Sequence, residues 1–237
     1  MTKRKIFVLA LAICLIAVVS MGTLAWFTAE DSIENEFNFA DSDDDGNTDF
    51  SVDVTESGDP EDDGLVFEEI LPGDKLAKDP TITNTSSSDR YTQYIRATLT
   101  LKDPTGAWKK ALDEKRIGGG TLMKTAHSVG LLAEMFQTVD LADDPDWEVA
   151  YDVNGGYGYD EDAKEFYWVF YYTDVLAKGE SVKLFTEVTI PTGLTVEDAN
   201  TMLSTFDVCV KAEAVQAENL GLESYQGAKE AFAVVEG

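Results

Sequence analysis

Residues 90–101, RYTQYIRATLTL, are the stretch that decides the fold class of this chain. Apolar and polar side chains alternate along it, and alternation with a period of two is typical of a β-strand with one face in a hydrophobic core. The predicted core face holds Ile95, Ala97, Leu99 and Leu101, and the opposite face holds Tyr94, Arg96, Thr98 and Thr100. We therefore predict a strand here, in a protein built mainly from such strands.

Further strand-like stretches lie on both sides of this one, and Pro and Gly turns separate them. Residues 166–173, FYWVFYYT, are apolar on both faces, which is typical of a strand in the middle of a sandwich. The other predicted strands lie within residues 64–76, 81–84, 147–153, 182–190 and 206–214. Many short strands with such turns predict a mainly β, antiparallel β-sandwich.

Helices are predicted as additions to this sandwich. The spacing of Trp108, Ala111 and Leu112 predicts one helical stripe, and apolar residues continue the pattern in a helical insertion at about 105–139. A short peripheral helix is predicted at 194–203, with Thr195 as N-cap, and residues 224–234 are interpreted as a last short helix or a mixed tail. His127 is the only histidine, and we interpret it as an ordinary helix residue because no second histidine is available to share a metal.

The first 25 residues have the pattern of a secretory signal peptide. A basic start at residues 3–5 precedes an uncharged apolar run at 6–19 and a set of small residues that ends at Ala25. We predict cleavage after Ala25, with cleavage after Trp26 as the alternative. The competing interpretation is an uncleaved anchor, since no charge occurs between Ile6 and Ala29.

Residues 26–40 are predicted to form an N-terminal strand. Apolar residues fall on odd positions, although Asp31 and Asn35 interrupt that face. The large apolar members are Phe27, Ile33, Phe37 and Phe39. A strand freed by signal cleavage has no preceding element with which to pair. It must therefore lie along an edge of its own sheet or add itself to the sheet of another molecule.

An acidic segment, residues 41–64, follows this strand and contains the start of a calcium-loop pattern. The carboxylates at positions 1, 3, 5 and 9 of the pattern are Asp41, Asp43, Asp45 and Asp49, with Gly46 at the turn. Position 12 is Val52, where an EF-hand loop has a bidentate Glu. Two interpretations remain open, a calcium site with a shifted closing ligand and a solvated acidic linker. Calcium is the one cofactor that the sequence suggests.

The overall charge restricts the partners. The formal net charge is −27, and it approaches −30 once residues 1–25, with three basic and no acidic side chains, are removed. A field of this sign disfavours nucleic acid and anionic lipid and favours divalent cations. Signal removal also leaves Cys209 as the only thiol, which we interpret as a small core residue.

Three groups of motifs resemble one known family. They are LAWFT at 24–28, LPGDKL at 71–76 with YIR at 94–96, and LAKGES at 176–181 with LFTEVTIP at 184–191 and AEAVQAEN at 212–219. Together they are similar to the TasA/camelysin family of exported proteins with a SipW-type signal peptide. The resemblance covers most of the chain apart from the acidic segment and the helical insertion.

The resemblance implies a jelly-roll-like sandwich, secretion, and cleavage by a dedicated signal peptidase. It also implies a location in the extracellular matrix or on the cell surface of a Gram-positive-type bacterium, and assembly of identical subunits into biofilm matrix fibres. In such fibres the freed N-terminal segment acts as a donor strand for the next subunit. The side chains that this role would bury in the neighbour are Phe27, Ile33, Phe37 and Phe39.

Two other functions remain open at this point. One is a monomeric adhesin or a module that binds matrix polysaccharide. The other is a camelysin-type metallopeptidase, which the sequence argues against because it has one histidine and no HExxH motif. We therefore expect no enzymatic activity. The predicted organisation is a signal peptide at 1–25, the possible donor strand at 26–40, the acidic segment at 41–64 and the sandwich domain at 65–237.

Overall fold

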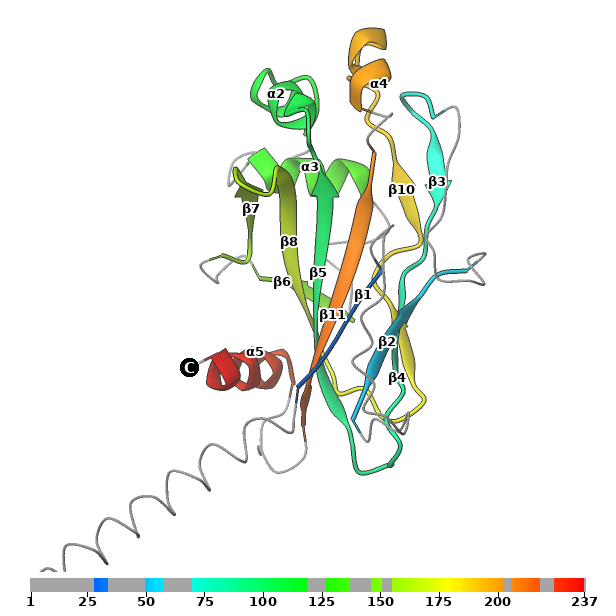
Figure 1. The fold of residues 1–237 in the computed structure, drawn as a ribbon, viewed down its shortest axis with the longest axis vertical. Coiled ribbons are helices and arrows are strands. Elements are labelled where there is room, and N and C mark those ends of the chain that lie inside the picture. The colour runs from blue at the N-terminus through cyan, green and yellow to red at the C-terminus, as the bar shows by residue number, and fades with distance from the viewer. Residues whose placement is uncertain are drawn as a thin grey trace, which may run out of the picture.

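The computed structural model describes residues 28–33, 50–57, 70–118, 127–136, 146–150, 155–202, 206–217 and 224–236. Within these ranges the protein is mainly β, and the strands of each sheet pair in antiparallel fashion. This confirms the predicted fold class. Figure 1 shows the largest sheet beside a second layer of smaller sheets, with helices at both ends of the molecule.

The main sheet has six strands. Its order is β1-β11-β5-β8-β6, and β7 also pairs with β8. The strands are β1 (Thr28–Ile33), β5 (Gln93–Lys102), β6 (Trp147–Val149), β7 (Tyr157–Asp160), β8 (Glu165–Tyr172) and β11 (Val208–Gln216). The predicted strands at 90–101 and 166–173 thus lie next to each other inside this sheet.

The second layer consists of a three-stranded and a two-stranded sheet. The orders are β2-β4-β9 and β10-β3. The strands are β2 (Val52–Thr55), β3 (Lys75–Ala77), β4 (Thr81–Asn84), β9 (Ser181–Lys183) and β10 (Glu187–Thr189). Because β3 is followed closely by β4, and β9 by β10, the two small sheets form one continuous ribbon in Figure 1.

One hydrophobic core lies between the two layers. Leu99 of β5, Trp168 of β8 and Ile82 of β4 are fully buried in it. The alternation of β5 is as predicted, with its odd positions in the core. In β8, Phe166, Trp168 and Phe170 also face this core, so the aromatic strand is a packing element.

The helices among the described residues are α2 (Ala107–Asp113), α3 (His127–Met135), α4 (Val196–Met202) and α5 (Ser224–Glu236). Both α2 and α3 fall in the predicted helical insertion, and α4 and α5 are the predicted peripheral helices. Trp108, Ala111 and Leu112 are buried as one stripe of α2. In Figure 1, α2, α3 and α4 lie at one end of the sandwich and α5 lies near the other.

One predicted strand is interrupted. Residues 182–190 were expected to be continuous, but the structure has two short strands, β9 and β10. Leu184 and Phe185 between them are both buried, and two consecutive inward side chains are incompatible with the alternation of a regular strand. Phe185 packs against Phe136, next to α3, with ring centroids 5.1 Å apart. The strand breaks so that both residues reach the core.

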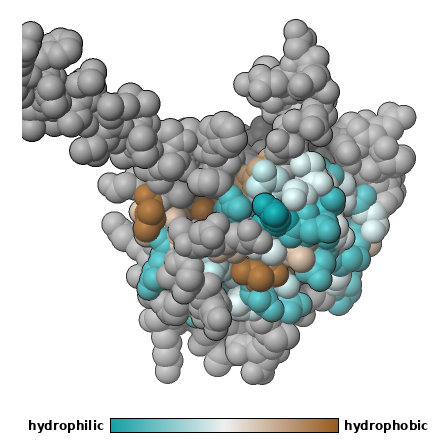
Figure 2. Space-filling view, turned by 90° about the horizontal axis from the view of Figure 1, so that it is seen from below, coloured by the Kyte–Doolittle hydropathy of each residue, from teal (hydrophilic) through white to brown (hydrophobic). Residues whose placement is uncertain are grey.

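The surface seen in Figure 2 is mostly hydrophilic where it is coloured, and hydrophobic residues form small separate areas. Among the large apolar side chains of the described residues, Leu71 and Val234 are exposed. The described part of the chain contains no helix that is long and apolar enough to cross a membrane.

Candidate functional site

The N-terminal strand β1 forms an edge of the main sheet. It pairs with β11 in an antiparallel register that runs from Thr28 opposite Val215 to Ile33 opposite Val210. On its other side β11 pairs with β5 along its whole length. The predicted N-terminal strand therefore exists at least over residues 28–33, and in this structure it lies on its own sheet.

The register defines two faces of this edge. Val210, Ala212 and Ala214 of β11 are buried in the main core, so positions 29, 31 and 33 of β1 fall on the core-facing side of the ladder. Strand β1 also lies against β2, the edge strand of the second layer, and β2 lies against β11. Val52 and Val54 of β2 belong to the same core. We call the region between β11 and β2 the seam. Core side chains of both strands border the seam, and β1 lies in it (Figure 1).

Polar contacts fix β2 at the end where it begins. The buried side chain of Gln93 donates from Nε2 to the carbonyl oxygen of Ser51 (2.8 Å) and to Ser86 Oγ (3.0 Å). The amide nitrogen of Ser51 also donates to Ser86 Oγ (3.1 Å). Nearby, Asn84 Nδ2 donates to the carbonyl oxygens of Tyr91 (2.7 Å) and Leu176 (2.8 Å). This network joins the start of β2 to β5 and to the loop after β4.

Charged groups fix β2 at its other end. Glu56 and Lys78 form an ion pair whose side chains are almost completely buried. The next carboxylate, Asp79, accepts hydrogen bonds from Ser57 N (2.9 Å), Ser57 Oγ (2.8 Å) and Lys183 Nζ (2.7 Å). Partial burial raises the pKa of Asp79, but the bonds from Lys183 and Ser57 outweigh it and hold that pKa below its usual value. Strand β2 is therefore held at both of its ends, and it forms one side of the seam.

The outer face of the edge is covered at one end by helix α5. Glu213 Oε2 of β11 accepts a hydrogen bond from Arg96 Nε of β5 (2.8 Å). The Arg96 guanidinium lies 4.5 Å from the centre of the Phe232 ring of α5, and Phe232 also packs against Tyr171 and Val215. Because Val215 is the partner of Thr28, α5 supports the sheet where β1 begins.

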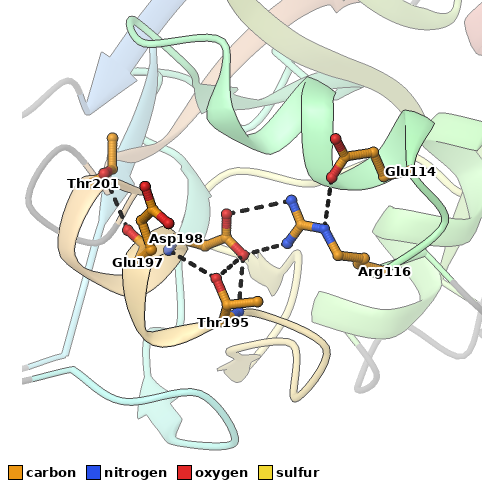
Figure 3. Close-up of polar contacts among 6 residues, drawn as sticks. All are labelled: Glu114, Arg116, Thr195, Glu197, Asp198 and Thr201. Carbon is orange, nitrogen blue, oxygen red and sulfur yellow. Dashed lines mark hydrogen bonds and ion pairs between the residues drawn. The ribbon is translucent and has the colours of Figure 1, made fainter.

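A second polar cluster joins α2 to α4 at the opposite end of the sandwich (Figure 3). Arg116 donates from Nε to Glu114 (2.8 Å) and through its two terminal nitrogens to Asp198. Asp198 N donates to Thr195 Oγ1 (3.2 Å), and Thr195 N donates back to Asp198 Oδ2 (2.8 Å), which also accepts from Thr195 Oγ1 (2.6 Å). This reciprocal pair is a capping box, and Thr195 is the predicted N-cap of α4.

The geometry of this cluster indicates a structural clamp. Partial burial raises the pKa of Asp198, but the bonds from Thr195 and Arg116 outweigh it and lower the pKa overall, so the carboxylate stays ionised and paired. A Cβ at Gly193 would lie 1.7 Å from the Arg116 carbonyl oxygen, so the two backbones meet where only glycine fits. The carboxylate, guanidinium and hydroxyl groups are saturated by one another. A capping role explains each of them without a reaction.

Most of the residues singled out in the sequence lie outside the described ranges. These are Ala25, Trp26, Phe27, Phe37, Phe39, Asp41, Asp43, Asp45 and Asp49. Ile33 is described as the last residue of β1. In the part of the chain that the structure describes, no three His, Cys, Asp or Glu side chains are placed to hold a metal ion. The calcium prediction for residues 41–49 is therefore not addressed by the structure.

The sequence did not indicate which strand of the main sheet would pair with the N-terminal strand. Residues 206–214 were recognised as an alternating strand, but nothing marked it as the partner of the N-terminal strand. Arg96 and Glu213 carried a usable signal, since both are charged positions on the polar face of an alternating strand.

Comparisons with protein-family models, with curated proteins and with solved structures found no match to this chain.

Proposed function

We propose that this chain is a secreted structural protein, a subunit of extracellular matrix fibres that assembles by exchange of its N-terminal strand. In the monomer β1 covers the seam of its own molecule. In the fibre the same strand of one subunit covers the seam of the next. The observation that carries the proposal is the position of β1, which is both N-terminal and an edge strand beside the core.

Strand exchange of this kind requires no new recognition surface. A neighbour's strand in the same register offers β11 the same backbone hydrogen bonds and the same side chains that its own strand offers. If β1 left without a replacement, the outer backbone groups of β11 would be unpaired and Val210 and Ala212 would be uncovered. An uncovered edge of this kind pairs strongly with a free strand. It is therefore covered either by the β1 strand of its own chain or by the β1 strand of another subunit.

The chain length between β1 and β2 permits the exchange. Residues 34–51 separate the two strands, and eighteen residues reach at most about 59–65 Å when fully extended. That is comparable with the diameter of a domain of this size, so a strand can remain connected to β2 and still reach a neighbour. The second strand is fixed at both ends and stays with its own molecule.

A reversible cross-link between β1 and β11 tests the proposal. Ser32 is opposite Lys211 in the register, and directly opposed residues of an antiparallel pair have a Cα separation that a disulfide can bridge. The substitutions Ser32→Cys and Lys211→Cys are made in a Cys209→Ala background, in the protein that begins at Trp26. Electron microscopy should show monomers when the disulfide is formed and fibres after reduction.

Two controls complete this experiment. Ser32→Cys alone, also with Cys209→Ala, should form fibres under both conditions. A protein without residues 26–40 should remain folded and should not polymerise. Fibres of the oxidised double-cysteine protein, with the intramolecular bond verified by mass spectrometry, would show that assembly does not use this strand.

The main alternative is a monomeric cell-surface module that binds a matrix polysaccharide. The pairing of β1 with its own β11 supports this alternative, because a self-covered edge has no need of a neighbour. It predicts that the processed protein remains a monomer at all concentrations tested and binds purified cell-wall or matrix polysaccharide. Fibre formation without such binding favours the structural subunit.

A further inference from the structure

A lysine and a glutamate are buried together at one end of the second layer. Glu56 directly follows β2, and Lys78 directly follows β3. Thr55 of β2 is opposite Thr81 of β4, and this register brings the chain after β2 alongside the chain before β4. Lys78 Nζ is in contact with Glu56 Oε1, and the two side chains are 7% and 1% exposed. An amine and a carboxylate thus meet where water is largely excluded.

The burial of this pair sets it apart from other lysine–carboxylate contacts of the same layer. The lysine side chain is 49% exposed in the pair of Lys183 with Asp79 and 61% exposed in the pair of Lys75 with Glu187. Water solvates the charges of such pairs, so the two groups remain ordinary surface ions. The charges of Lys78 and its partner lack that solvation and depend on each other.

The polar groups of the buried pair are incompletely satisfied. Within the described part of the chain, Glu56 Oε2 is buried and receives no hydrogen bond. An ammonium has three N–H donors, and Glu56 Oε1 accepts from the ammonium of Lys78. Leaving one oxygen of a buried carboxylate unpaired is costly, whereas the single oxygen of a neutral amide costs less to leave unpaired. Replacement of the two charges by an amide would therefore lower the cost of burial.

We propose that Glu56 and Lys78 condense to an intramolecular isopeptide bond once the chain has folded. The Lys78 nitrogen bonds to the Cδ atom of Glu56, and the bond from Cδ to Oε1 breaks. Two of the three ammonium protons pass to Oε1, which leaves as water, and the third stays on the amide nitrogen. One positive and one negative charge disappear together, so atoms and charges balance within the pair. The fold holds nucleophile and carbonyl carbon side by side, which replaces a bimolecular encounter.

The bond would anchor β2 covalently in the second layer. Signal removal leaves Cys209 as the only thiol, so an internal disulfide is not available for this purpose. In the fibre, tension on a donated β1 reaches its own subunit through the linker and then through β2. A bond between Glu56 and Lys78 passes this tension directly to the chain before β4, and residues 57–77 bear none of it. This mechanical role rests on the proposed function, whereas the bond itself does not.

Mass spectrometry of the denatured protein tests the bond. The purified chain, full length or processed, should weigh about 18 Da less than its sequence requires, because one water is lost when the amine acylates. Trypsin should leave Lys78 uncut and yield a branched peptide, in which residues 76–90 are joined to the peptide that ends at Lys75. Fragment ions of the branched peptide should place the bond at Glu56.

Two variants serve as controls. Lys78→Arg keeps a cation beside Glu56 but removes the amine nucleophile, so this variant should have its full calculated mass. Lys183→Arg, in an exposed pair, is the matched control and should keep the loss of one water. Full mass of the folded wild-type protein after prolonged incubation overturns the inference. A loss of water that persists in Lys78→Arg also overturns it, since a succinimide at an Asp-Gly step would then be the source. The branched peptide of the wild-type protein decides the question even where Lys78→Arg does not fold.

Electron microscopy of the same samples separates this inference from the proposed function. Fibres of a protein that has its full calculated mass contradict the bond and leave the proposed function intact. A cross-linked protein that never polymerises supports the bond and contradicts the fibre function. Where both are found, Lys78→Arg fibres should dissociate at a lower urea concentration than wild-type fibres, and equal resistance would contradict the mechanical role.

Discussion

Glu213 and Arg96 face each other across β11 and β5 on the outer surface of the main sheet, and their 2.8 Å hydrogen bond lies under helix α5. The same guanidinium stacks on Phe232 of α5. One cation thus connects the acceptor strand, the neighbouring strand and the C-terminal helix. Both side chains of the ion pair are mostly buried, so the bond is less screened than a surface pair.

We predict that Arg96→Met lowers the free energy of unfolding by about 1–3 kcal/mol, since it removes a charge-assisted hydrogen bond and a cation–π contact. Helix α5 should detach first, and amide hydrogen exchange in residues 224–236 should accelerate. Arg90→Met, at an exposed position before the same strand, should have little effect. Unchanged exchange in α5 would contradict a linking role for Arg96.

The buried ion pair of Glu56 and Lys78 gives a second prediction. Lys78→Met alone leaves a buried carboxylate without its partner, which costs about 3–5 kcal/mol in systems of this kind. Adding Glu56→Leu should recover most of that loss, because two apolar side chains replace two buried charges. Urea unfolding of the single and double variants measures the difference. Equal stability of the two variants would mean that the pair contributes little coupling.

Tyr159 predicts a loss of stability at alkaline pH. Burial and the nearby Asp103 carboxylate raise the pKa of its phenol to about 12, above the usual value of about 10. The protonated phenol is therefore favoured in the folded state. Its contribution is complete below pH ~10 and is lost as the pH rises toward ~12.

Tyr159→Phe should flatten this part of the stability curve, measured by urea unfolding at several alkaline pH values. Tyr157→Phe, at the first residue of the same strand β7, is the control and should keep the slope. Phenolate absorbance should show one fewer tyrosine titrating at high pH in Tyr159→Phe. An unchanged slope would mean that a group other than Tyr159 causes the loss of stability at alkaline pH.

Calcium removal tests the acidic segment. If residues 41–49 hold calcium, millimolar calcium should raise the Tm of the mature protein and a chelator should reverse the change. Asp43→Asn with Asp45→Asn should abolish the calcium-dependent part of the rise, whereas Asp59→Asn with Asp62→Asn should retain it. The absence of any calcium response in the parent protein would support the solvated-linker interpretation.

The strand pattern was predictable because burial on one face imposes a period of two, and Ile95, Leu99 and Trp168 are buried as that pattern requires. The helices were predictable from stripe spacing and from the Thr195 cap. The break at Leu184 and Phe185 was not, because two adjacent apolar residues also fit a strand that is buried on both faces. The contact of Phe185 with Phe136, the residue after α3, is a long-range contact that the local pattern does not contain.

The sequence predicted less of the candidate site than of the fold. Alternation indicates that residues 28–33 form a strand, but the identity of its partner is a long-range property that local patterns do not contain. The contact of Glu56 with Lys78 is also long-range, since 22 positions separate the two residues. A lysine or a glutamate is ordinary in sequence, and a buried pair of them is recognisable only when the fold is known.

The pairing of Thr28 with Val215 brings together the first described strand and the last strand of the main sheet, and under the proposed function this has a consequence for timing. Under the proposed function the chain is exported with its N-terminus first, so β1 would arrive outside the cell before β11. During that interval the new strand has no partner in its own molecule. A fibre end whose subunit has donated its own β1 presents an uncovered β11, and such an end at the site of export would capture the new strand before self-coverage competes. Under the proposed function, the order of emergence itself would then favour polymer over monomer.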